Sequence, residues 1–183
     1  MNLQGHAYYI AQDATGHFGV LTADNEVIVP FQYIKVCEIE SSYFCGTGKN
    51  TCHLYNAQAQ HVWTASGTSH LTNSNNAIYS YKDISSFFDK TTQKVVKIRL
   101  PKNDTNYAID DISMSFDFFL LYKRDKLEKS KVGLCNRKGK PLLPAIYDNI
   151  NVTEAEKYIK ATLNEQYYYF NYRGKRLKKV PSL

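Results

Sequence analysis

The chain has 183 residues, which is enough for one well-buried core and short for two. Hydrophobic residues make up 43% and charged residues 22%, and this balance excludes wholesale disorder. No stretch approaches the roughly 18 apolar residues of a membrane-spanning helix, and the first residues lack the basic and apolar regions of a signal peptide. Aromatic residues make up 14% of the chain, which favours β-sheet because rings pack well on a pleated surface.

Charge divides the chain into two unlike parts. Residues 1–91 contain 4 Lys and 7 acidic residues, so 4 − 7 gives −3. Residues 92–183 contain 19 basic and 10 acidic residues, so 19 − 10 gives +9. Such an asymmetry is found on partner-facing surfaces and equally on solvated surfaces without a partner.

The first predicted elements are a short strand at residues 8–10 and a hairpin over residues 18–36 (FGVLTADNEVIVPFQYIKV). Thr22 begins the turn, where its hydroxyl can accept backbone hydrogen bonds, and Asn25 tolerates the left-handed conformation that closes it. Pro30 has no N–H group, so we expect the second strand of the hairpin to end there and a connection to begin.

The second and third copies are weaker. An apolar strand at 43–45 precedes a hairpin at 53–64, where Asn56 and Ala59 occupy the two special turn positions. A strand at 77–79 precedes a hairpin at 86–97, where Asp89 and Thr92 occupy them.

The fourth copy, residues 132–150 (VGLCNRKGKPLLPAIYDNI), matches residues 18–36 almost position for position. Gly133 corresponds to Gly19 and Pro144 to Pro30, with the same spacing between them. A strand at 118–121 precedes this hairpin. The fifth copy has a strand at 158–159 and a hairpin at 168–179, and its turn uses Asn171 and Gly174 as the fourth uses Asn136 and Gly139.

A period of about 35 residues predicts a repeat architecture. We expect one all-β domain over 1–183, built from five three-stranded β-meander units at about 6–40, 41–74, 75–115, 116–157 and 158–183. One unit cannot bury its apolar face alone, so neighbouring units must stack. The stack is either an open solenoid or a closed propeller-like ring.

The two strong copies share a Gly-[Val/Leu]-x₄-[Asn/Gly]-x-x-[Leu/Ile]-[Val/Leu]-Pro-x-x-Tyr core, which resembles the WG (KWG) repeat of bacterial proteins. The chain departs from that repeat by having Phe18 and Val132 where Trp is usual before Gly. The other three copies are degenerate. The resemblance implies a repeat scaffold without shared catalytic residues.

Basic residues cluster at two places. An insertion at 123–131 (KRDKLEKSK) enlarges a loop of the fourth unit, and a second insertion at 101–113 lengthens the link before that unit. Insertions in repeat proteins often lie on the binding face, and simple tolerated loop growth is the alternative. The chain ends in a basic segment after the last hairpin. The predicted partner-binding residues are Lys123, Arg124, Lys126, Lys129, Arg173, Lys175, Arg176, Lys178 and Lys179.

Catalytic and metal motifs are missing from the sequence. It has no Gly-x-Ser-x-Gly elbow, Gly-rich phosphate loop or dinucleotide fingerprint, so we expect neither an enzyme nor a cofactor. Cys37, Cys45, Cys52 and His53 are close in sequence, but their spacing is not that of a zinc finger, so we expect no metal site. His53 stands where Gly stands in the strong copies. Cys135 aligns with apolar and aromatic residues, which indicates a structural role. The four cysteines are too few for a disulfide scaffold, and we expect them to be reduced in the cytoplasm.

These observations favour a non-enzymatic protein-binding module. Bacterial chains of this kind are often immunity proteins, so our specific hypothesis is neutralisation of a cognate toxin by binding it. The alternative is a nucleic-acid-binding protein, because the YYYFNYRGKRLKK segment interleaves aromatic with basic residues as single-strand binders do.

Overall fold

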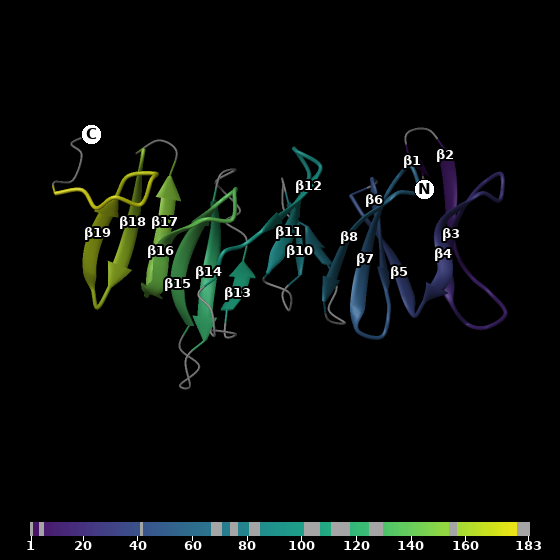
Figure 1. Ribbon diagram of the computed structural model, residues 1–183, viewed down its shortest axis with the longest axis horizontal. Helices are drawn as coiled ribbons and strands as arrows, with labels where there is room; N and C mark the ends of the chain where they lie inside the picture. The colour runs from purple at the N-terminus through teal and green to yellow at the C-terminus, as the bar shows by residue number, and fades with distance from the viewer. Residues whose placement is uncertain are drawn as a thin grey trace. The chain divides into compact units, whose positions relative to one another are not determined.

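The computed structural model describes residues 2–3, 6–40, 42–66, 71–73, 77–80, 85–100, 107–110, 118–124, 130–153 and 157–178. These residues form 19 strands in five small antiparallel sheets and contain no helix. The all-β prediction is therefore confirmed. Figure 1 shows that the strands of each sheet follow one another in chain order, as a meander.

The first sheet contains β1 (Asn2–Leu3), β2 (His6–Gln12), β3 (Phe18–Thr22) and β4 (Val27–Tyr33). The second contains β5 (Lys35–Ile39), β6 (Tyr43–Thr47), β7 (Thr51–Asn56) and β8 (His61–Ser66). The third contains β9 (Leu71–Asn73), β10 (Ala77–Ser80), β11 (Ser86–Asp89) and β12 (Lys94–Lys97).

The fourth sheet contains β13 (Tyr107–Asp110), β14 (Phe118–Arg124), β15 (Ser130–Asn136) and β16 (Pro141–Tyr147). The fifth contains β17 (Asn149–Thr153), β18 (Tyr158–Leu163) and β19 (Gln166–Phe170). The strand β13 lies within the insertion at 101–113. Within the described residues the chain contains no helix of the length and apolarity that a membrane crossing requires.

Sheets and sequence repeats are offset by one strand. Only Ile34 separates β4 from β5, and only Asp148 separates β16 from β17, so the first and fourth units pass directly into the next sheet. A unit thus contributes three strands to one sheet and the first strand of the following one. The prediction of three strands and a connection was wrong here, because the segments after Pro30 and Pro144 are strands.

The prediction that Pro30 and Pro144 end their strands was wrong. Pro30 lies inside β4 and Pro144 inside β16. Both strands are the last of their sheets, where a missing N–H leaves no neighbouring carbonyl unsatisfied. The register shifts beside each proline, between Phe18 and Val20 and between Val132 and Leu134, so a β-bulge absorbs the irregularity.

Four of the five hairpin turns follow one hydrogen-bonding scheme, which confirms the turn chemistry predicted for them. The Asn136 side-chain oxygen accepts from the backbone N–H groups of Lys138 and Lys140, each at 3.0 Å. Thr22, Asn56 and Asn171 accept from the residues two and four positions ahead in the same way. The fourth turn residue has a positive φ in four of the copies: Asn25 (63°), Ala59 (62°), Gly139 (73°) and Gly174 (78°).

The third hairpin departs from this scheme. Its positive φ of 56° is at Gln93, one residue after the predicted Thr92. The Asp89 carboxylate accepts from the N–H groups of Thr91 (2.9 Å) and Thr92 (3.2 Å), which are two and three positions ahead. The turn is therefore one residue longer than its counterparts.

The chain divides into two compact units. Unit 1 comprises Met1–Asn73, Ala77–Asp83 and Phe88–Val95, and unit 2 comprises Ser74–Asn76, Ile84–Phe87 and Val96–Leu183. In unit 1 one apolar cluster joins the first and second sheets through Tyr33, Phe44 and Tyr55, and another surrounds Leu54, Trp63 and Phe88.

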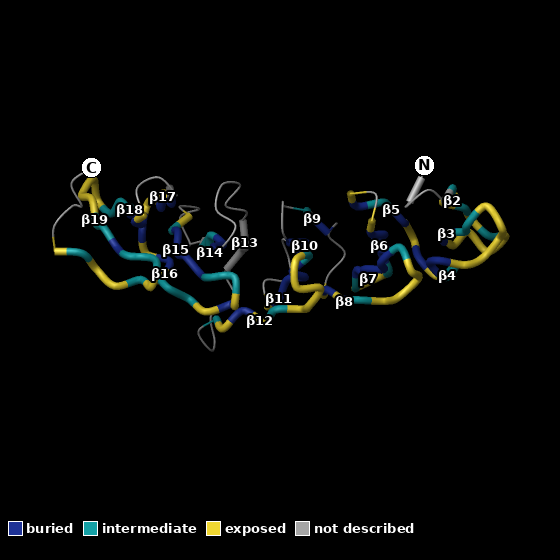
Figure 2. The backbone as a smooth tube through the Cα atoms, turned by 90° about the horizontal axis from the view of Figure 1, so that it is seen from above, coloured by how far each residue is buried: buried dark blue, intermediate teal, exposed yellow. Residues whose placement is uncertain are grey.

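The strand β6 of the second sheet is buried on both faces, and all five of its residues are buried (Figure 2). In unit 2 the fourth and fifth sheets share a cluster around Leu134, Tyr147 and Ile159. Stacking of neighbouring sheets explains how such small meanders become stable.

Candidate functional site

The basic segment at the end of unit 2 is held on a hydrogen-bonded turn. The side chain of Asn171 accepts from the backbone N–H groups of Arg173 and Lys175, each at 3.0 Å. Beyond the turn, Arg176 forms a β-bridge with Phe170, and the N–H of Leu177 donates to the carbonyl of Tyr169 at 2.8 Å. Four of the predicted binding residues, namely Arg173, Lys175, Arg176 and Lys178, are exposed on this segment. Lys179 lies outside the described residues.

Two cations of this region pack on tyrosine rings of β19. The guanidinium carbon of Arg176 lies 4.7 Å from the centre of the Tyr168 ring, and Nζ of Lys160 lies 4.0 Å from that of Tyr167. Such cation–π contacts hold long basic side chains in place while leaving their charge in solvent. Burial raises the pKa of Tyr147, and the charge of nearby Arg176 opposes this shift.

The last two strands, β18 and β19, and the turn after them carry an excess of positive charge, whereas Glu154 and Glu156 lie in the segment before β18. Residues 157–178 contain six basic residues and one acidic residue, Glu165, so 6 − 1 gives +5. We call the exposed cations Arg173, Lys175, Arg176 and Lys178 the terminal basic cluster. An exposed field of one sign on a rigid turn can steer an acidic macromolecule to this surface.

The second predicted basic segment is only partly described. Lys123 and Arg124 are the last residues of β14 in the fourth sheet, where they pair with Lys131 and Ser130 of β15. Lys131 itself forms an ion pair with Asp148. Nothing is described of the Arg124 side chain, and Lys126 and Lys129 lie outside the described residues. These four positions remain predicted binding residues.

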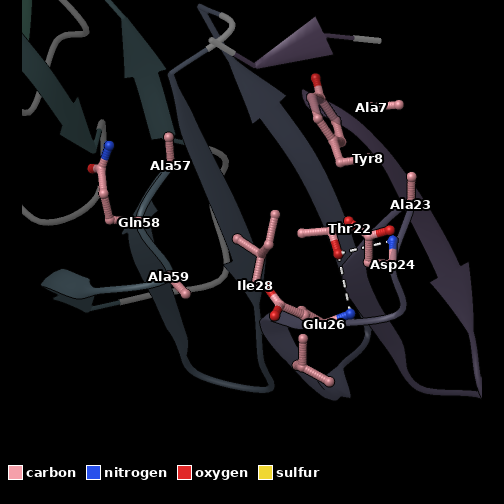
Figure 3. Close-up of a pocket in the computed structure, with 11 residues that line it drawn as sticks. Ala7, Tyr8, Thr22, Ala23, Asp24, Glu26, Ile28, Ala57, Gln58 and Ala59 are labelled. Atoms are coloured by element: carbon pink, nitrogen blue, oxygen red, sulfur yellow. Dashed lines mark hydrogen bonds between the residues drawn. The ribbon is translucent and has the colours of Figure 1, made fainter. Parts of the chain in front are cut away.

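Unit 1 contains a pocket of about 360 Å³ between the first two sheets (Figure 3). The hydroxyl of Thr22 accepts from the N–H groups of Asp24 (3.3 Å) and Glu26 (3.1 Å), which shapes the turn at its mouth. The opposite wall comes from the β7–β8 turn. The lining residues are Ala7, Tyr8, Thr22, Ala23, Asp24, Glu26, Val27, Ile28, Ala57, Gln58 and Ala59. This volume is at the small end for a ligand site.

The structure separates the cysteines from His53. Cys37 and Cys45 are directly paired between β5 and β6, and Cys52 joins them in the apolar cluster that faces the third sheet. His53 follows Cys52 in β7, so its side chain lies on the opposite face. All four cysteines are free thiols, and Cys135 is fully buried. Within the described part of the chain, no three or more His, Cys, Asp and Glu side chains are placed to hold a metal ion together.

No protein-family model matches the chain, and a search of curated proteins finds none that matches it. The terminal basic cluster is therefore supported as a candidate site by its geometry and charge alone. The sequence prediction found the cations of the terminal basic cluster but not the tyrosines beneath them. Period-2 alternation along 166–170 could have indicated which rings share a face with Lys160.

Proposed function

We propose that this chain is a non-enzymatic protein-binding module that uses the terminal basic cluster to bind an acidic protein. The observation that carries the proposal is the +5 charge of residues 157–178, presented on a hydrogen-bonded turn beside a sheet. A backbone fixed in this way loses little conformational freedom on binding, which favours affinity. Arg and Tyr are also the residue types that contribute most to binding energy at protein interfaces.

A protein partner is favoured over single-stranded nucleic acid by the state of the tyrosine rings. Nucleic-acid binders of that kind need free ring faces on which bases stack. Arg176 covers a face of Tyr168, and Lys160 covers a face of Tyr167. Nucleic acid remains the second candidate, because Tyr167 is still 59% exposed.

Within the protein-binding class, we propose a cytoplasmic immunity protein that neutralises a bacterial toxin. The support is the resemblance of residues 18–36 and 132–150 to the WG repeat, whose scaffold carries no shared catalytic residues. The five sheets would stack as an open solenoid or a closed ring. Small-angle scattering distinguishes these forms, since a compact chain of this length has a radius of gyration of about 16 Å and an open solenoid a larger one.

The experiment is capture of partners from a nuclease-treated lysate of the source cell on three baits. They are the wild-type chain, the quadruple variant R173Q/K175Q/R176Q/K178Q, and the control variant K35Q/K49Q/K94Q/K97Q. The control removes the same charge from exposed lysines of other sheets. A protein that is captured by the wild type and the control, but lost by the quadruple variant, supports the proposal. Equal capture by all three baits contradicts it.

Toxin identity is tested by co-expressing each captured protein with and without the wild-type chain. An immunity protein restores growth when its partner alone arrests it. Retention of a mixed-sequence oligonucleotide by the wild type and not by the quadruple variant would favour the nucleic-acid alternative.

A further inference from the structure

His53 and His61 lie side by side on the face of the second sheet that the cysteines do not occupy. Nδ1 of His53 is 3.4 Å from Nε2 of His61, and the ring centres are 5.4 Å apart. The hydroxyl oxygen of Thr64 lies 3.3 Å from the first nitrogen and 2.9 Å from the second. Two imidazole nitrogens and one hydroxyl thus form a small triangle at the surface of unit 1.

We propose that His53 and His61 together bind a divalent transition-metal ion of the zinc or copper class. Zinc binds imidazole nitrogen at about 2.0–2.1 Å, so two nitrogens on one tetrahedral ion lie about 3.3 Å apart. The 3.4 Å between the two histidine nitrogens fits this span with little movement. Imidazole is a preferred ligand of zinc, copper and nickel, and water would complete the coordination.

The half-buried His53 is oriented for this role by its neighbours. Its other ring nitrogen, Nε2, lies 2.9 Å from the hydroxyl of Thr51. A hydrogen bond donated from Nε2 to Thr51 leaves the lone pair on Nδ1, the nitrogen that faces His61. Metal-binding histidines are commonly oriented by such an outer hydrogen bond. The buried Tyr33 ring, centred 5.5 Å from that of His53, packs beside it.

A β-bulge brings His61 onto the same face. Leu54 pairs with Trp63, but the next residue, Tyr55, pairs with His61, so the register skips Val62. Without that skip, alternation would direct His61 to the face that carries Trp63. Val62 instead packs against the apolar cluster, and His61 is exposed to solvent, where an ion can reach it.

The same register shift occurs in the two strong repeats, so this backbone geometry is shared. The two histidines are found only at the second unit's positions among these three copies. Val27 and Pro141 occupy the position of His61 in the first and fourth sheets. Gly133 occupies the position of His53, because a Cβ there would lie 2.8 Å from the carbonyl oxygen of Leu143. In the second unit Thr64 pairs directly with His53 and stands where the strong copies have proline. Two histidines thus stand at positions that carry no metal ligand in the first and fourth copies.

The test is titration of the tag-free chain with ZnCl₂, CuCl₂ and NiCl₂ at neutral pH, followed by calorimetry. The wild type should bind one equivalent of at least one ion. H53Q and H61Q should each weaken that binding by about tenfold or more. The variant H17Q is the matched control, because His17 is an exposed histidine in the connection between β2 and β3, and it should bind as the wild type does. With CuCl₂, electron paramagnetic resonance should show coupling to two nitrogens.

His61 is exposed, so H61Q keeps the test valid even if H53Q does not fold. The proposal is overturned if the wild-type chain binds none of the three ions. Binding that survives in H61Q and is lost in C37S also overturns it, because the thiols would then be the ligands. The site is in unit 1 and the terminal basic cluster is in unit 2, so the two proposals stand or fall separately.

Discussion

Tyr33 and Tyr55 join the first two sheets through their hydroxyl groups, which lie 2.6 Å apart in a buried contact. Their rings meet edge to face, with centres 6.1 Å apart. The Gln32 side chain also donates to the Tyr33 hydroxyl at 3.0 Å. Burial, and then the hydrogen bond with Tyr55, raises the pKa of Tyr33, so the Tyr33 hydroxyl remains neutral at physiological pH.

The first prediction concerns this hydroxyl pair. Y33F should lower the free energy of unfolding by about 1–2 kcal/mol, because it leaves a buried hydroxyl on Tyr55 without this partner. Y55F should cost less, because Tyr33 keeps the hydrogen bond from Gln32. The double variant should cost less than the sum of the two. Urea denaturation measures all three, and additive losses would show that the hydroxyls act independently.

The second prediction contrasts equivalent turn positions. Gly139 has a φ of 73°, and a Cβ there would lie 2.1 Å from the carbonyl oxygen of Lys97. G139A should therefore destabilise the chain by about 1–2 kcal/mol or more. Ala59 adopts a φ of 62° with a Cβ present, so A59G should stabilise it by up to about 1 kcal/mol. Thermal unfolding measures both changes, and effects of the same sign would contradict the shared turn geometry.

The third prediction concerns pH. Lys90 donates to the carboxylate of Glu40 and to the side chain of Asn73. Burial alone would raise the pKa of Glu40, but the hydrogen bonds from Asn73 and Lys90 outweigh it and lower that pKa below 4.5. A depressed acid pKa contributes stability that is present above the unfolded value and is lost as the pH falls through the folded value.

E40Q should accordingly cost less than about 1 kcal/mol at neutral pH, since the pair is partly exposed. The difference from wild type should shrink as the pH falls below about 4.3. Glu165 is exposed on the fifth sheet, so E165Q serves as the control. Urea denaturation across this range is the measurement, and a pH-independent difference would contradict the assigned pKa direction.

The fourth prediction concerns thiol reactivity. The hydrogen bond from Cys45 lowers the pKa of Cys37, and the same contact raises that of Cys45. Burial raises the pKa of Cys135 to about 12. Cys37 is also only partly buried. Pulsed alkylation with mass spectrometry should therefore modify Cys37 before Cys45 and Cys135, with a rate midpoint below the free-thiol pKa of about 8.5. Faster modification of Cys135 would contradict this order.

Local chemistry explains which parts of the fold could be predicted from the sequence. The turns at 136–139 and 171–174 were predictable because Asn accepts backbone hydrogen bonds and Gly permits a positive φ. The strand Lys35–Ile39 was missed because Pro30 was interpreted as a strand end, although an edge strand tolerates proline.

Side-chain directions near bulges were harder to predict. Simple alternation from Trp63 places His61 on the wrong face, because the skip at Val62 depends on the turn geometry. The cations of the terminal basic cluster were evident from composition. Their contacts with Tyr167 and Tyr168 depend on the register of β18 and β19, which composition does not contain.

The final measurement is the association rate of the captured protein partner with the wild type, the R173Q/K175Q/R176Q/K178Q variant and the K35Q/K49Q/K94Q/K97Q control, at low and high salt. The quadruple variant should associate about tenfold more slowly at low salt and show a flatter salt dependence, with a smaller change in dissociation. The control should follow the wild type. An unchanged association rate in the quadruple variant would contradict binding through the terminal basic cluster.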